Sequence, residues 1–268
     1  GTEGIISKDD WSAYLKQKAS DFDTEHIFPI FGNNQTITLS EWKTKGFDAN
    51  FFENFYKLFN SGTIPTDSST ISKIQFEKFI GWKKGNFLDS DADNYALSKE
   101  NLVANLKFNQ KLFEKIAGSN DQIFSDNIKE WNIKRTAYQE GTYNFAFPQN
   151  SFADINFDGD SYISKFEWRA LGLDDNLYNK IVSISGSVNN INFASFVTEL
   201  NNYKNGNFEN SAYIKNDSGN ILRSLWTAKG MCLNEKLFNK IAGSNNIEYI
   251  SSQIWQSFSD KQILWKNG

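Results

Sequence analysis

The sequence predicts an all-α fold built from repeated helical units, and three observations support this prediction. Apolar residues recur at spacings of three and four, as at Phe51, Phe55 and Leu58, which is the period of an amphipathic helix. Only 3 prolines interrupt the 268 residues, and 24 phenylalanines indicate aromatic-rich helices joined by short polar turns. The motif Leu-Phe-x-Lys-Ile-Ala-Gly-Ser-Asn occurs at residues 112–120 and again at residues 237–245.

The repeat extends beyond this motif and indicates four units of roughly sixty residues each. In three of them an isoleucine is followed by a tryptophan five residues later and by a glycine four residues after that. These residues are Ile37, Trp42 and Gly46; Ile163, Trp168 and Gly172; and Ile221, Trp226 and Gly230. Leu97 and Leu102 occupy the matching places in the remaining unit. Such spacing is typical of one supersecondary unit that the chain uses several times.

Residues 156–167 read Asn-Phe-Asp-Gly-Asp-Ser-Tyr-Ile-Ser-Lys-Phe-Glu and place oxygen-bearing side chains at loop positions 1, 3, 5, 9 and 12. Calcium prefers about six to eight oxygen ligands, and a twelve-residue loop with this spacing can supply them. The predicted ligands are the side chains of Asn156, Asp158, Asp160 and Ser164, the carbonyl of Tyr162 and both carboxylate oxygens of Glu167. A register that begins at Asp154 would put Lys165 at position 12, and lysine cannot bind calcium.

Two residues depart from the usual calcium loop. Asn156 at position 1 removes one negative charge, and Ser161 stands at position 6, where glycine usually provides a positive φ. Both departures should weaken the site without abolishing it. The alternative interpretation is a polar turn that only resembles a calcium loop.

The loop and the repeat together resemble the EF-hand superfamily across essentially the whole chain. The resemblance implies an all-α chain of tandem EF-hand pairs, with eight hands in two lobes, at residues 1–140 and 141–268. It also implies short antiparallel β-bridges between the position-8 residues of paired loops. The expected bridges are Ile37 with Ile71, Leu97 with Ile123, Ile163 with Ile191, and Ile221 with Ile250. The Glu-Trp ending of the first hand is similar to sarcoplasmic calcium-binding proteins and calcium-triggered photoproteins.

Most of the implied loops lack calcium ligands, so we expect a structural role for them. Counting back from Ile37 puts Ile30 at position 1, and counting back from Ile71 puts Ile64 there. An isoleucine side chain offers calcium no oxygen. One loop with strong acidic residues therefore stands out from seven weaker ones.

The loop at residues 89–100 is ambiguous and gives a possible second metal site. One register places Asp89, Asp91, Asp93, Tyr95 and Glu100 at ligand positions, but it puts Ala96 at position 8. The repeat instead makes Leu97 position 8 and Asn101 position 12. The alternative to a metal site is a solvated acidic turn, although clustered carboxylates repel one another without a cation.

Composition excludes several classes of function. The net charge of −4 and pI near 5.2 argue against a nucleic-acid partner. A single cysteine, Cys232, permits no intrachain disulfide, and no apolar stretch reaches the ~20 residues of a membrane span. A cytoplasmic location is expected, although a removed targeting segment stays open. With one histidine, His26, and no GxSxG, GxxxxGK[ST] or HExxH motif, we expect no enzymatic activity.

The sequence therefore predicts a non-enzymatic calcium-binding protein with a structural, scaffolding or partner-binding role. Its partner would be another protein or a second copy of the chain. The single methionine, Met231, argues against a methionine-rich groove of the kind that binds many targets. Alternatives are a photoprotein-like carrier of a small ligand, which the lone His26 disfavours, and a calcium sensor or buffer.

Overall fold

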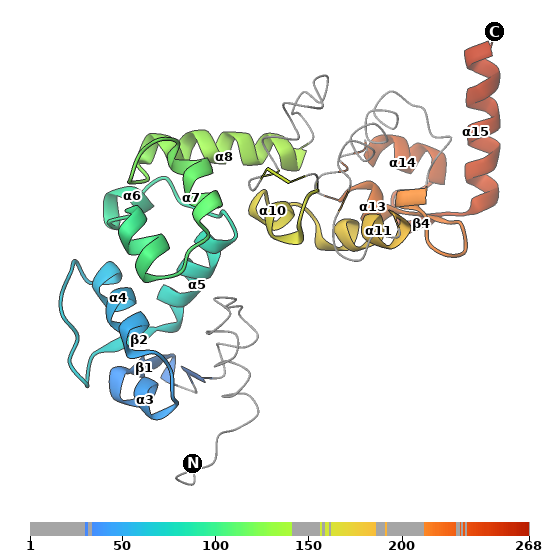
Figure 1. The fold of residues 1–268 in the computed structure, drawn as a ribbon. Helices are drawn as coiled ribbons and strands as arrows, with labels where there is room; N and C mark the ends of the chain where they lie inside the picture. The colour runs from blue at the N-terminus through green and yellow to red at the C-terminus, as the bar shows by residue number, and fades with distance from the viewer. Residues whose placement is uncertain are drawn as a thin grey trace. The chain divides into compact units, whose positions relative to one another are not determined.

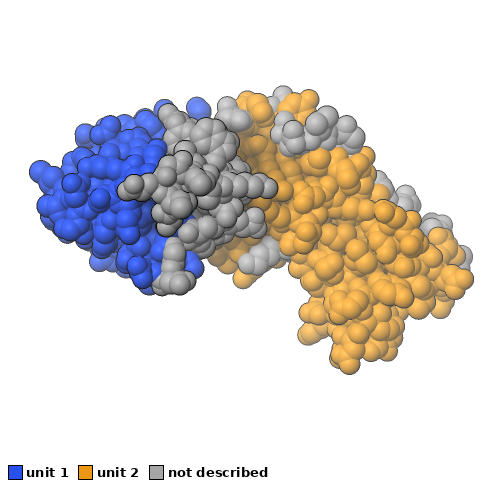
Figure 2. Space-filling view, turned by 90° about the horizontal axis from the view of Figure 1, so that it is seen from below, with its two compact units in different colours: residues 1–132 blue, residues 133–268 orange. Residues whose placement is uncertain are grey.

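The computed structural model describes residues 30–31, 34–140, 156, 159–160, 162–185, 191, 212–228, 231, 233 and 235–267. The chain divides into two compact units, Gly1–Asn132 and Ile133–Gly268 (Figure 2). Helix α8 (Ser125–Glu140) crosses the boundary between them, and the lobe boundary predicted after residue 140 falls at the end of this helix. Residues His26, Asp158, Ser161, Gly230 and Cys232 lie outside the described part.

The first unit alternates short helices with extended segments (Figure 1). Its elements are β1 (Thr36–Thr38), α3 (Leu39–Thr44), α4 (Ala49–Phe59), β2 (Thr70–Ser72), α5 (Lys73–Lys83), α6 (Asp91–Asn94), the π-helix η2 (Glu100–Asn105), α7 (Gln110–Ala117) and the start of α8.

The core of the first unit is aromatic. Helix α4 turns Phe51, Phe52 and Phe55 inward, as the spacing of its apolar residues predicts. The ring of Phe55 stacks on Phe76 of α5 with centroids 4.4 Å apart. Trp42 is fully buried among these rings. Stacked and edge-on rings fix the approach of α3, α4 and α5, because aromatic pairs prefer such geometries.

The second unit contains the helix that follows the predicted calcium loop (Figure 1). Its elements are the end of α8, α10 (Lys165–Ala170), α11 (Asp175–Ser185), the 3-10 turn η3 (Ala212–Ile214), β3 (Ile221–Leu222), α13 (Arg223–Trp226), α14 (Glu235–Ala242), β4 (Tyr249–Ile250) and α15 (Ser252–Asn267). Within the described ranges, no helix is both long and apolar enough to cross a membrane.

Three of the four bridges that the resemblance implies are present in the structure. Ile37 pairs with Ile71 in the β1–β2 sheet, Ile221 pairs with Ile250 in the β3–β4 sheet, and Ile163 forms an isolated bridge with Ile191. In the fourth place Ser98 bridges Gln122, and the amide of Ile123 donates to the carbonyl of Leu97 over 3.0 Å. All eight position-8 side chains are buried.

The predicted fold class is nevertheless wrong. The described chain is mostly helical but contains two small antiparallel sheets, and its helical elements include a π-helix, a 3-10 turn and the single turn α6. The all-α class and the uniform arrangement of eight hands in two four-hand lobes do not describe this structure. Pairing extends beyond single bridges because Thr36, Ile37 and Thr38 are β-branched and alternate between the core and the surface.

The tryptophan and glycine of the repeat have structural roles. Trp42 and Trp168 are fully buried, and each indole donates to a backbone carbonyl six residues on, Asp48 at 2.8 Å and Asp174 at 2.7 Å. Gly172 has a φ of +68°, a left-handed conformation that favours glycine after a helix. The tryptophan therefore anchors the short helix, and the glycine ends it.

Candidate functional site

The predicted calcium loop has its two end ligands buried. Asn156, at position 1, is 5% exposed, and Glu167, at position 12, is 2% exposed. Asp160 is exposed, and Tyr162 is 44% exposed. Burying a carboxylate is costly unless hydrogen bonds or a cation compensate for the lost water. The position-3 ligand, Asp158, lies outside the described residues.

Backbone amides of the loop point at its side-chain oxygens. The Asn156 Oδ1 atom accepts from the Gly159 amide at 2.7 Å, and Asp160 Oδ1 accepts from the Tyr162 amide at 2.6 Å. The Asn156 Nδ2 group donates to the Asp160 carbonyl. Gly159 has a φ of +77°, which a side chain would disfavour. These contacts draw Asn156, Gly159, Asp160 and Tyr162 together in one turn.

Ser164 and Glu167 form a capping box at the start of α10. Glu167 Oε2 accepts from the Ser164 amide at 2.8 Å and from its hydroxyl at 2.7 Å, while Ser164 Oγ accepts from the Glu167 amide. The same box recurs between Thr38 and Glu41 and between Ser72 and Gln75. Position 12 therefore has a helix-capping role in loops that lack calcium ligands, which the Ser/Thr-x-x-Glu/Gln spacing could have revealed.

A short β-bridge fixes the far side of the loop. Ile163 and Ile191 exchange two backbone hydrogen bonds, at 3.0 and 3.1 Å. The Tyr178 hydroxyl on α11 lies 3.3 Å from the Ile163 carbonyl, to which it donates. Burial, and then the negative charge of Glu167, raise the pKa of Tyr178 to about 12. The loop, α10 and α11 are thus electrostatically connected.

The raised pKa of Tyr178 predicts a loss of stability at high pH. The unfolded chain releases this proton near the ordinary tyrosine pKa of about 10, whereas the folded chain holds it to about 12. The resulting stabilisation is complete below pH 10 and is lost between pH 10 and pH 12. We expect the free energy of unfolding to fall more steeply there for the wild-type chain than for Tyr178→Phe. Urea titrations at several pH values measure the two slopes, and equal slopes would contradict the prediction.

The donor set of the loop fits calcium better than a softer metal. Asn156, Asp160, Ser164, Glu167 and the Tyr162 carbonyl offer only oxygen atoms, which hard cations prefer. Within the described ranges, no three His, Cys, Asp or Glu side chains gather into a metal-holding group. A metal ion at this loop would need amide, hydroxyl and carbonyl oxygens in addition to the carboxylates.

In the possible second site, the ammonium group of Lys78 is the cation beside the Asp91 carboxylate. Asp91 is 1% exposed, and its carboxylate accepts from Lys78 Nζ at 2.8 Å, from Trp82 Nε1 at 2.6 Å and from the Leu88 amide at 2.8 Å. Lys78 and Trp82 lie one turn apart on α5. The sequence did not reveal this contact, because the ammonium comes from the preceding helix.

The other predicted ligands of this loop have separate partners. Asp89 Oδ1 accepts from Asn132 at 3.0 Å, and Asp93 Oδ1 accepts from the Ser125 hydroxyl at 2.6 Å. The Tyr95 ring packs on Phe59 and Trp82, and the exposed Glu100 begins η2. The Ile123 amide donates to the Leu97 carbonyl, and this places Leu97 at position 8 and Asn101 at position 12. The structure does not gather the five predicted ligands around one point, and a metal at this loop stays a prediction.

Side chains of α8 contact the end of α10, which sequence reasoning also missed. Arg135 Nε donates to the Ala170 carbonyl at 3.0 Å, and Gln139 Nε2 donates to the Leu171 carbonyl at 3.0 Å. Burial lowers the pKa of Arg135, but a guanidinium stays charged at neutral pH. A positive charge at a helix C-terminus is favourable. The spacing of four between the two donors is the only sequence signal for this contact.

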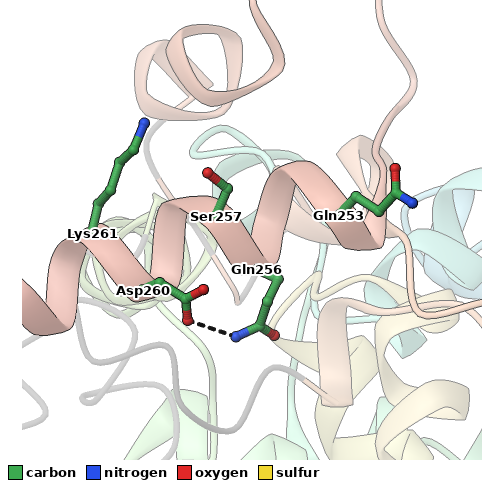
Figure 3. A pocket seen from close by; sticks show the side chains of 5 residues that line it. All are labelled: Gln253, Gln256, Ser257, Asp260 and Lys261. Carbon is green, nitrogen blue, oxygen red and sulfur yellow. Dashed lines mark hydrogen bonds between the residues drawn. The ribbon is translucent and has the colours of Figure 1, made fainter.

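A shallow concavity on α15 offers little chemistry. Gln253, Gln256, Ser257, Asp260 and Lys261 line it (Figure 3). All five are exposed, and Gln256 donates to Asp260 at 2.8 Å. Because none of these five lining residues is buried, the loop at residues 156–167 remains the principal candidate site. No protein-family model, curated protein or solved structure matches the chain.

Proposed function

We propose that this chain is a non-enzymatic calcium-binding protein that holds one calcium ion in an EF-hand-type loop at residues 156–167. One observation supports the proposal most strongly. Asn156 and Glu167, the first and last ligand positions, are buried at the two ends of a turn rich in oxygen donors. The capping box alone does not bury position 12, because Glu41 and Gln75 close the same box while exposed and half-buried, respectively, whereas Glu167 is buried. Burying a carboxylate is costly without a compensating group.

Under this proposal Asn156, Asp158, Asp160 and Ser164 bind through side-chain oxygens, Tyr162 through its carbonyl, and Glu167 through its carboxylate. Bound calcium would supply the positive charge that compensates for the buried carboxylate. It would also join the first turn of α10 to the preceding loop. The Ile163–Ile191 bridge holds the middle of the loop while the two ends close around the ion.

The proposed role is structural or partner-binding, with one calcium-dependent part. A single well-equipped loop in 268 residues is unsuited to calcium buffering, which needs many sites. We propose a protein partner or self-association, because the net charge of −4 opposes binding to a nucleic-acid backbone. The single cysteine agrees with a reducing, cytoplasmic environment, which we include in the proposal.

Calorimetric titration of calcium into the chelator-stripped full chain tests the proposal. We expect one ion per chain, because Asp91 of the 89–100 loop is already paired with Lys78, and Asp89 and Asp93 have separate partners. Magnesium titrated in parallel should bind more weakly, since it demands a smaller, regular octahedron. If added calcium produces neither a heat of binding nor a change in structure, the proposed function is wrong. Two ions per chain would add the 89–100 loop as a second site.

A further inference from the structure

Helix α10 is short, and side chains hold both of its ends. It spans Lys165–Ala170, and helices of this length are unstable by themselves. The Ser164–Glu167 capping box holds its N-terminal turn. Arg135 and Gln139, which we call the α8 clamp, bind the carbonyls of Ala170 and Leu171 at its C-terminal end. The clamp therefore holds the C-terminal end of α10, in addition to the anchor that Trp168 provides.

The space around Gly172 shows how closely the clamp fits. Gly172 has a φ of +68°, and a Cβ atom there would overlap the ends of the Arg135 and Gln139 side chains. Gly46 occupies the same place in the repeat, with a φ of +79°, but nothing lies within 4 Å of its Cβ position. Of the two repeat glycines that the structure describes, only Gly172, at the end of the helix that carries Glu167, has this close contact.

We propose that Arg135 and Gln139 are positioning residues for the calcium loop. They hold the C-terminal end of α10, so that Glu167, one turn earlier, presents its carboxylate in a fixed place. Neither residue is a calcium ligand. Fixing a ligand before binding raises affinity, because less conformational entropy is lost when the ion binds. This inference rests on the proposed calcium site and names residues that set its affinity.

Charge and positioning predict opposite effects for Arg135. If the guanidinium acted only through its charge, its removal would strengthen calcium binding, since like charges repel. If it acts by positioning α10, its removal weakens binding. The sign of the change therefore separates the two explanations.

The experiment compares calcium titrations of full-length Arg135→Met, Gln139→Leu and Gly172→Ala with the wild-type chain. We expect affinity to fall about tenfold in each, as for the loss of an outer partner of a metal ligand. Amide hydrogen exchange in α10, measured in chelator, should become faster in the same variants. Gly46→Ala is the control for a methyl group at positive φ, and Lys129→Met is the control for a lost charge on α8. Both controls should keep wild-type affinity.

Unchanged or tighter calcium binding by Arg135→Met and Gln139→Leu would overturn the positioning role. If Arg135→Met does not fold, Gln139→Leu and Gly172→Ala still decide the matter. Failure of the wild-type chain to bind calcium would overturn the proposed function and, with it, the role in affinity. Amide exchange of α10 in chelator would then decide separately whether the clamp holds α10. If exchange in the clamp variants equals that of the wild-type chain, the clamp does not hold α10.

Discussion

Replacement of Glu167 by glutamine is expected to weaken calcium binding by more than about 100-fold. Loss of an outer partner alone costs about 10- to 100-fold in metal affinity, and Glu167 is the bidentate ligand itself. The substitution removes one negative charge and replaces one carboxylate oxygen with an amide group that cannot bind the ion. Calorimetric titration of the full-length variant measures the effect.

Glutamine is the informative replacement because the chain already uses it in the same structural role. Gln75 closes a capping box with Ser72, in which its Oε1 accepts from the Ser72 amide at 2.8 Å. Glu167→Gln should therefore keep α10 capped while losing the calcium ligand. Any loss of affinity is then attributable to the carboxylate and not to a frayed helix.

Glu41→Gln is the matched control. Glu41 closes the equivalent box with Thr38, and these hydrogen bonds lower the pKa of the Glu41 carboxyl. Its loop has Ile30 at position 1, so this variant should bind calcium with wild-type affinity. Equal affinities of Glu167→Gln and the wild-type chain would show that the 156–167 loop is not the calcium site.

Replacement of Asp91 by asparagine should destabilise the first unit by about 3 kcal/mol, the low end of the cost of breaking a buried ion pair. The carboxylate is 1% exposed and lies 2.8 Å from Lys78 Nζ. Asparagine has only one acceptor oxygen for the donors of Lys78, Trp82 and Leu88, and its amide adds donors of its own. Lys78 would therefore keep its charge without the carboxylate that compensates it.

Hydrogen exchange of the α5 amides measures this loss in the first unit alone, and exchange in α11 serves as the internal reference. Asp93→Asn is the control, because Asp93 is exposed and surface changes are usually within about 0.5 kcal/mol. Similar protection in the two variants would show that the buried pair adds little stability. The calcium stoichiometry should stay unchanged in both, and a lost calcium would identify the 89–100 loop as a metal site.

The pairing of the loops could be predicted from the sequence, whereas the partners of individual charges could not. Isoleucine and leucine recur at a fixed place in each repeat, and a buried position in a short bridge needs such a residue. The sequence also distinguished the 156–167 loop by the types of its side chains. The contact of Lys78 with Asp91 depends on how α5 approaches the following loop, which no local pattern records. Single bridges were expected at Ile37 and Ile71, and their extension into a three-residue pairing was missed because the threonines beside Ile37 were not considered as strand formers.

Because Lys78 is part of the chain, its pairing with Asp91 does not depend on the concentration of any dissolved ion. A cation attached to the chain is present at a fixed effective concentration, so its occupancy does not change when the solution is diluted or chelator is added. A dissolved ion stabilises a fold only in proportion to the logarithm of its free concentration. If the 156–167 loop binds calcium, the same chain contains one buried carboxylate, Asp91, that is always paired with a cation of the chain, and another, Glu167, that is paired with a cation only when calcium is bound. Depletion of calcium would then loosen α10 while leaving α5 and α6 as firmly folded as before.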